Sequence, residues 1–167
     1  MSPSSLNKFA KLIGSIKSSV PSSFHSAALS LAFNSQVKFA MTSGIKVEKL
    51  TTEKAEVSLK NRMRVRNHIG GVHACGMALL AESATGMVFA MSVRDDCLPL
   101  MKTMNIDFTR RAKGDLKAFA TIDDKLRQQI QAKDKGEVVV PVTVTDSDGK
   151  EPIKASMTWA WVPKSKV

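Results

Sequence analysis

The sequence predicts an α+β fold in which an antiparallel sheet wraps around one long buried helix. Between His73 and Arg94 the chain is apolar except for a single acid, Glu82, and a helix that is apolar nearly all round is buried on most sides. Segments that alternate apolar and polar residues, the period of a half-buried strand, lie on both sides of this helix. The chain has 167 residues, which is enough for one domain with a core and too few for two.

The first 20 residues form a basic segment whose apolar side chains recur at helical spacing, namely Leu6, Phe9, Ala10, Ile13 and Ile16. A mitochondrial presequence is one interpretation, because the segment is rich in serine and lacks acids. Presequences are usually rich in arginine as well, and no arginine precedes Arg62. A packed helix is the other interpretation. Since Pro21 and its neighbouring serines mark a boundary, we divide the chain into residues 1–20, a basic amphipathic segment, and residues 21–167, the main domain.

Residues 24–40 are compatible with a second helix, and two strands are predicted at residues 45–47 and 55–59, around Thr51 and Thr52. The long apolar helix follows these strands. The expected order is therefore helix, two strands, one long apolar helix and then further strands.

Beyond the apolar helix, Asp95 and Pro99 interrupt the chain. Asp123-Asp124 predicts the start of a short polar helix, which one of the two could cap. Pro141 suits an edge strand or a bulge. Four segments alternate like strands, the last two of which close a hairpin: residues 104–109, 116–122, 138–145 and 153–161.

Glu82 and the polar segment before its helix together predict a catalytic site. A lone carboxylate in an apolar helix is costly to desolvate, so burial should raise its pKa, and functional sites often use such groups. Two structural alternatives compete with this one. Glu82 could face solvent at the edge of the helix, or the run could span a bilayer, for which roughly 20 apolar residues suffice. A central acid would cost roughly 2.5–3.5 kcal/mol in a bilayer.

Charge and cysteine content restrict the partners. The net charge is +10, and residues 1–47 hold five lysines and no acid, a surplus that attracts anionic partners without choosing among them. Cys75 and Cys97 match no disulfide framework or metal site, so we expect no metal and a reducing compartment. Cys75 near His73 is conceivable as a nucleophile, although small buried cysteines are common. We expect no nucleic-acid partner, because aromatic stacking platforms are missing among the basic residues.

The motif Asn67-x-x-Gly70-x-x-His73-Ala74, with Glu82 nine residues after the histidine and Met104-Asn105-Ile106 opening the next strand, resembles the hotdog-fold thioesterases of the PaaI-like group. Members of that group carry Asn-x-x-Gly-x-x-His-Gly-Gly and an acid nine residues after the histidine. The likeness covers residues 44–122 and indicates a less-characterised branch. It implies the hotdog fold for residues 21–167, with one long central helix and an extra N-terminal helix.

The resemblance also implies roles for the site residues. Glu82 would act as a general base toward water or as a nucleophile on the acyl carbon. Asn67, supplied by the other subunit of a dimer, would orient the water or the thioester. The backbone N–H of Ala74 would stabilise the oxyanion, and His73 would anchor the loop.

Substrate contacts are implied for a further set of residues: Gly70, Gly71, Cys75, Thr103, Arg110, Arg111 and Lys113. Ala74 and Cys75 replace the two glycines of the family motif, which changes the close approach to the substrate. Thr103 could supply the hydroxyl that some relatives place at the start of the following strand. Arg110, Arg111 and Lys113 could meet the phosphates of coenzyme A, as could Arg62, Arg64 and Arg66. A solvated basic face is the alternative for each of these cations.

The function implied is that of an acyl-CoA thioesterase of lipid metabolism, with coenzyme A as part of the substrate and no other cofactor. The protein would be a homodimer or a dimer of dimers in the cytoplasm, or alternatively in the mitochondrion. A non-catalytic hotdog protein that binds acyl-CoA or an acyl carrier is the main alternative. A hotdog dehydratase is disfavoured, because no histidine is paired with an acid in the way that chemistry requires.

Overall fold

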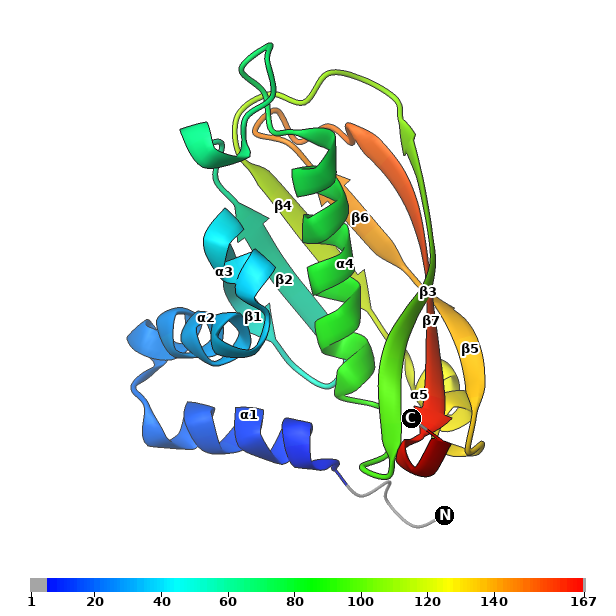
Figure 1. Cartoon of the computed structure of the whole chain (residues 1–167). Helices are drawn as coiled ribbons and strands as arrows, with labels where there is room; N and C mark the ends of the chain where they lie inside the picture. Colours follow the sequence, from blue (N-terminus) through cyan, green and yellow to red (C-terminus); the bar gives the residue numbers. More distant parts are fainter. Residues whose placement is uncertain (1–5, 167) are drawn as a thin grey trace.

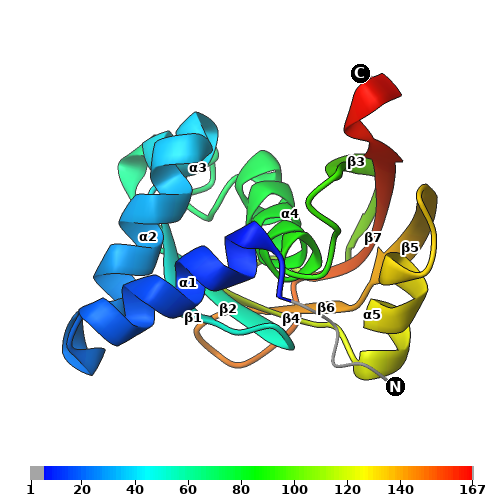
Figure 2. The ribbon, with the colours of Figure 1, turned by 90° about the horizontal axis from the view of Figure 1, so that it is seen from below.

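The computed structural model of the chain describes residues 6–166. Within them, seven strands form a four-stranded sheet, in the order β1-β2-β4-β6, and a three-stranded sheet, in the order β3-β7-β5. All neighbouring strands are antiparallel, and the sheets bend around the central helix α4 (Ala74–Ala90), as Figures 1 and 2 show. The strands are β1 (Ile45–Leu50), β2 (Lys54–Leu59), β3 (Cys97–Phe108), β4 (Leu116–Thr121), β5 (Gly136–Val140), β6 (Val142–Thr145) and β7 (Ile153–Pro163). The predicted α+β class is confirmed.

Pro141 joins the two sheets. It separates β5 from β6, and β5 pairs with β7 whereas β6 pairs with β4. Proline has no backbone N–H to donate to a ladder, so the strand predicted over 138–145 changes partner at this residue. The predicted hairpin with residues 153–161 is therefore correct for β5 and wrong for β6.

The remaining helices are α1 (Lys8–Ser19), α2 (His25–Gln36), α3 (Lys38–Ser43) and α5 (Asp124–Gln131). The single helix predicted over 24–40 is divided at Val37, whose ψ of 88° is not helical. Gly44 ends α3 with a φ of +80°, the left-handed conformation that glycine adopts without strain. The cap predicted at Asp123-Asp124 is confirmed, and Asp123 is the N-cap, since its side chain accepts the N–H of Leu126 at 2.7 Å.

The basic N-terminal segment is a packed helix over residues 8–19. Ala10 and Ile13 of α1 are buried. The side chain of Asn7 ties the helix to the end of α4, because its amide donates to the carbonyl oxygens of Ala90 at 2.7 Å and Val93 at 2.5 Å. No helix within residues 6–166 meets the length and hydropathy needed to cross a membrane.

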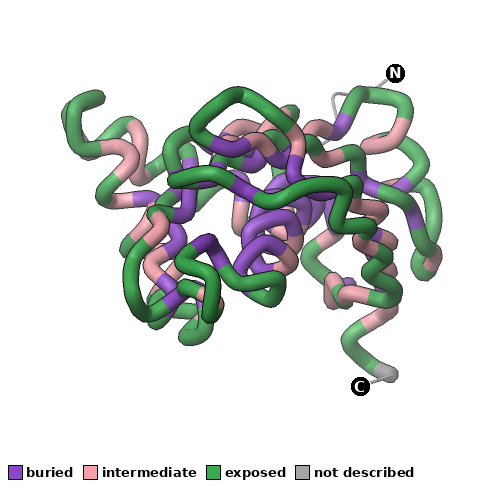
Figure 3. The backbone as a smooth tube through the Cα atoms, turned by 90° about the horizontal axis from the view of Figure 1, so that it is seen from above, coloured by how far each residue is buried: buried purple, intermediate pink, exposed green. Residues whose placement is uncertain are grey.

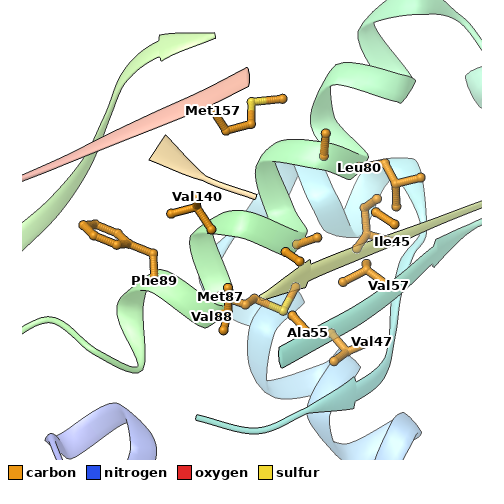
Figure 4. Close-up of a cluster of buried hydrophobic side chains, with 14 of the residues drawn as sticks. Ile45, Val47, Ala55, Val57, Leu80, Met87, Val88, Phe89, Val140 and Met157 are labelled. Atoms are coloured by element: carbon orange, nitrogen blue, oxygen red, sulfur yellow. The ribbon is translucent and has the colours of Figure 1, made fainter. Parts of the chain in front are cut away.

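The core lies between α4 and the concave face of the bent sheet, and α4 is the most continuously buried segment in Figure 3. Trp159 of β7 packs against Gly86, and its indole N–H donates to the hydroxyl of Thr85 at 2.9 Å. Phe89 lies against the same indole, with ring centroids 5.5 Å apart. Figure 4 shows part of this core: Ile45, Val47, Ala55, Val57, Leu80, Met87, Val88, Phe89, Val140 and Met157.

The two edges of the combined sheet differ. At the β1 edge, α2 supplies side chains to the strand's backbone: Ser26 donates to the carbonyl of Val47 at 2.7 Å, Ser30 accepts the N–H of Val47 at 2.9 Å, and Asn34 donates to the carbonyl of Ile45 at 3.0 Å. At the other edge, β3 pairs with β7 on one side and with no strand of residues 6–166 on the other. The β3 edge is thus open to pairing, and the β1 edge is closed.

Candidate active site

Glu82 lies on a stripe of α4 that the sheet covers only in part. Residues four apart in a helix share a face, and from residue 76 onward every fourth position of α4 keeps some exposure while the intervening ones are buried. The partly exposed positions are Ala78, Glu82, Gly86 and Ala90, in line with the exposed Ala74 at the start of the helix. Glu82 is therefore a partly exposed carboxylate set among small residues on the more open side of the helix.

The environment of Glu82 favours its protonated form. Burial raises the pKa of Glu82, and the neighbouring Ser83 hydroxyl offsets only part of the effect. Within residues 6–166 Glu82 forms no ion pair. A carboxylate with a raised pKa that still reaches the surface is a stronger base than a fully solvated one, and it is better suited to accept and return a proton.

The N-terminus of α4 offers a free backbone donor beside an exposed histidine. His73 is the N-cap, and its Nδ1 accepts the N–H of Cys75 at 3.1 Å. Its carbonyl oxygen accepts the N–H groups of Gly76 at 2.9 Å and Met77 at 3.1 Å. The N–H of Ala74 has no hydrogen-bond acceptor in the described part of the chain, so it is available to an oxyanion at the positive end of the helix dipole.

Asn67 holds the loop that leads into α4. Its Oδ1 accepts the N–H groups of Ile69 and Gly71, both at 3.1 Å. Gly70 has a φ of +79°, which explains the need for glycine there. The Oδ1 of Asn67 is thus engaged in stabilising the turn. In residues 6–166 its Nδ2 donates to no acceptor, and this amide is the part of the side chain that remains for a substrate or a water molecule.

The basic residues predicted to contact coenzyme A already have intramolecular partners. Arg110 pairs with the buried Asp146 at 2.9 Å, and Lys113 pairs with Asp148 at 2.9 Å. Arg111 donates to the carbonyl oxygen of Ile69 at 2.6 Å. Arg110 and Lys113 therefore hold the loops together in this structure.

Three further arginines lie on the loop before α4. Arg62 is the N-cap of the short 3-10 helix η2 (Met63–Val65) and Arg64 lies within it, and both are exposed with no ion pair in residues 6–166. Arg66 is held by the side-chain oxygen of Asn61 at 3.0 Å. Arg62 and Arg64 are thus the less engaged cations near the start of α4.

The structure does not bring Thr103 to Glu82 within one chain. Residues directly opposite each other on antiparallel strands share a face. Thr103 pairs with Thr158, whereas Met104 pairs with the buried Met157. Thr103 therefore points to the outer face of the sheet, and the register shift between Met101 and Thr103 accounts for the change of face.

Sequence reasoning did not single out the apolar side of β3. Ile106 pairs with Ala155 and Phe108 with Ile153, so both side chains lie on the face directed toward α4, as Met104 does. Met104 and Phe108 remain exposed although they are apolar. The alternation of residues 104–109 predicts a strand, but it does not show that the inward side chains of the strand stay uncovered. Only the structure shows that. Cys75 is exposed at the helix start, whereas Cys97 is buried.

Comparison with known proteins shows one matching family model and several solved structures of similar fold. The family model described as a domain of unknown function, DUF4442, matches residues 25–162. A Pseudomonas aeruginosa protein of unknown function, described as a probable thioesterase, superposes with a TM-score of 0.74 at 23% identity, over 86% of this chain and 97% of that chain. A mutant thioesterase from the same species gives 0.66 at 20% identity, over 80% and 94%. A thioesterase from Haemophilus influenzae gives 0.62 at 14% identity, over 75% and 82%.

No curated protein matches the sequence. At these identities the solved structures establish the fold alone. The hotdog fold expected from the motif around Asn67 and His73 is therefore confirmed, together with the resemblance at the level of fold. The roles of the individual site residues remain predictions.

Proposed function

The chain belongs to the DUF4442 family, and from this premise we propose that it is an acyl-CoA thioesterase in which Glu82 drives the hydrolysis. The observation that carries the proposal is the half-buried carboxylate on the open stripe of α4, with a pKa raised by burial and no ion pair in residues 6–166. The likeness of the fold to proteins described as thioesterases supports the reaction class.

Two routes are open to Glu82. As a general base, the carboxylate takes a proton from water, and the water oxygen adds to the acyl carbon. The tetrahedral intermediate then expels the thiolate, which receives the proton from Glu82. As a nucleophile, the carboxylate adds to the acyl carbon, releases the thiolate and forms an anhydride that water hydrolyses. The raised pKa favours the first route, because it makes the carboxylate a stronger base toward water.

The N–H of Ala74 is proposed to stabilise the oxyanion of this intermediate. Ala74 and Glu82 are eight residues apart, which is about 12 Å along a helix axis, whereas directly reacting atoms must approach to about 3–3.5 Å. We therefore propose a homodimer in which the Ala74 N–H of one protomer and Glu82 of its partner form one site. The open edge of β3 is the surface on which a second copy extends the sheet.

The phosphates of coenzyme A are proposed to lie near the loop before α4. Arg62 and Arg64 are exposed there without ion pairs in the described residues. Arg111, already fixed on the carbonyl of Ile69, presents the rest of its guanidinium to the same region. Arg110 and Lys113 would bind the phosphates only if a phosphate replaced Asp146 or Asp148 as their partner.

Thiol release tests the proposal directly. We expect wild-type protein to release thiol from one or more members of a panel of short, medium and long acyl-CoAs, and Glu82→Gln to lower the rate by roughly 10²-fold or more. Glu137→Gln is the matched control, because Glu137 lies on β5 and pairs with Lys102. Equal turnover in the wild type and Glu82→Gln would remove Glu82 from the mechanism.

A non-catalytic acyl-CoA-binding protein of the same fold is the second candidate. It would bind acyl-CoA saturably in a calorimeter and release no thiol, in the wild type and in Glu82→Gln alike. The exposure of Glu82 favours the enzyme, because a binder has no need to keep an unpaired carboxylate on its open face.

A further inference from the structure

The N-terminal layer, which we define as residues 6–47, exposes apolar side chains in a segment without acids. Of the thirteen large apolar side chains that are exposed in the described chain, six lie in this layer: Leu6, Leu12, Phe24, Leu31, Phe39 and Met41. The same segment contains five lysines and no aspartate or glutamate. It comprises α1, α2 and α3, which lie together at one side of the molecule (Figures 1 and 2).

The inner face of helix α2 carries polar side chains beside the buried Leu29 and the partly buried Phe33. Its polar residues Ser26, Ser30 and Asn34, four apart, face inward and bond to the backbone of β1. On the opposite side Phe24, which precedes the helix, and Leu31 are 60% and 74% exposed. Because the hydrogen bonds to β1 fix the rotation of α2, these apolar side chains cannot turn into the core.

The charges around this face are positive. Lys38 follows α2, and Lys11 is exposed on α1, which packs beside α2. The nearest acids at the border are engaged: Glu48 pairs with Lys46 at 2.8 Å, and Asp95 accepts the backbone N–H of Lys8 at 2.8 Å. Lysines around exposed Phe and Leu side chains match a surface that is both anionic and apolar.

We propose that the outer face of α2, with the adjoining α1 and α3, binds the surface of a lipid bilayer that contains anionic lipid. Phe24 and Leu31 enter the headgroup region, and Lys11 and Lys38 meet the lipid phosphates. A second copy of the chain fits this face less well, because it would bring the same lysines together with no carboxylates between them. The binding does not depend on the proposed hydrolase activity.

Vesicle co-sedimentation of the full chain tests the proposal. We expect the wild type to bind phosphatidylcholine vesicles containing about 30% phosphatidylglycerol more tightly than vesicles of phosphatidylcholine alone, and to lose affinity as salt rises. Phe24→Ser with Leu31→Ser should weaken partitioning about tenfold or more. Val139→Ser is the matched control, since Val139 is 53% exposed on β5, outside the layer.

A charge variant supplies a second measurement. Lys11→Gln with Lys38→Gln should lower affinity for the anionic vesicles by about fivefold per lysine and leave the weak binding to phosphatidylcholine unchanged. The melting temperature of each variant shows that it is folded. The proposal fails if the wild type binds neither vesicle, if Phe24→Ser with Leu31→Ser binds as the wild type does, or if that double variant instead dissociates an oligomer in light scattering.

Discussion

Asp146 is the buried carboxylate on which the loops around the candidate site depend. Its side chain has no exposed area. One oxygen accepts the N–H groups of Asp148 at 3.0 Å and Lys150 at 3.1 Å, and the other accepts the N–H of Lys113 at 3.1 Å and the guanidinium of Arg110 at 2.9 Å. The same carboxylate therefore shapes the turn before β7 and anchors the segment that follows β3.

Asp146→Asn keeps the size of this side chain and removes half of its acceptors. The amide oxygen can still serve the turn, but the amide group then faces two donors, the N–H of Lys113 and the guanidinium of Arg110. An unsatisfied buried N–H costs about 1–3 kcal/mol, and a partly exposed ion pair contributes about 0–1 kcal/mol. We expect a loss of about 2–3 kcal/mol, which for a chain of this length lowers the melting temperature by about 4–12 °C.

The pH dependence separates this mechanism from a packing defect. Burial by itself would raise the pKa of Asp146, but the backbone N–H groups of Lys150, Lys113 and Asp148 and the charge of Arg110 outweigh it, so the pKa lies below the usual 3.8. A group with a lowered pKa stabilises the fold above its unfolded value and loses that contribution as pH falls through its folded value. The difference between wild type and Asp146→Asn should be complete at pH 7 and shrink only below about pH 3.8.

Thermal unfolding followed by circular dichroism at pH 7, 5 and 3 measures both effects. Asp148→Asn is the matched control, because Asp148 is exposed and its ion pair with Lys113 should contribute less than about 1 kcal/mol. If Asp146→Asn melts within about 1 °C of the wild type at pH 7, the hydrogen-bond account of this loop is refuted.

Two further predictions concern α4. Glu82→Gln should be more stable than the wild type at pH 7 and equal to it near pH 4, because a pKa raised in the folded state makes stability fall as pH rises above about 4.5; melting curves at both values check this, and a variant that is less stable at pH 7 would contradict it. Gly86→Ala should destabilise the fold by about 1–3 kcal/mol in urea unfolding, because its Cβ would lie 2.8 Å from the ring of Trp159; unchanged stability would show that the indole shifts freely.

Much of the fold follows from local patterns, and its exceptions have identifiable causes. The apolar run around Glu82 predicted α4, since burial on most sides leaves a simple compositional trace. Pro141 predicted a break in the strand over residues 138–145. The strands with which the two halves of this segment pair depend on residues far away in the sequence. The inward polar stripe of Ser26 and Asn34 was not predicted, because helical periodicity does not reveal that a sheet edge will use those side chains.

The candidate site was predictable in part for the same reason. The spacing of the sequence motif predicted Asn67, His73 and Glu82 as site residues. The structure shows that two of them shape the backbone: Asn67 closes the turn and His73 caps the helix. The engagement of Arg110 with Asp146 could not be read from the sequence, because the pair is 36 residues apart and joins two loops. A cluster of cations in a sequence therefore does not show which of them are free to bind phosphate.

A dimer whose sites each combine two protomers makes a prediction that a single-chain site does not. Ala74→Pro removes the proposed oxyanion donor with little harm to the helix, because proline is favoured at the first helical position and His73 already has the extended conformation that precedes proline. Glu82→Gln and Ala74→Pro should each be inactive alone. When equal amounts of the two variants are unfolded together and refolded, half of the dimers contain one chain of each variant. Each of these mixed dimers has one intact site if Glu82 and Ala74 act across the interface.

We therefore expect the mixture to recover about a quarter of wild-type thiol release, since a two-fold symmetric dimer has two equivalent sites. Two control mixtures, each of one variant refolded with itself, should stay inactive. If Ala74 and Glu82 instead serve the same site within one chain, every mixed dimer holds two damaged sites and the mixture stays as inactive as its parents. Recovery thus reports which chain supplies each group, and it does so without any knowledge of the acyl chain that the enzyme prefers.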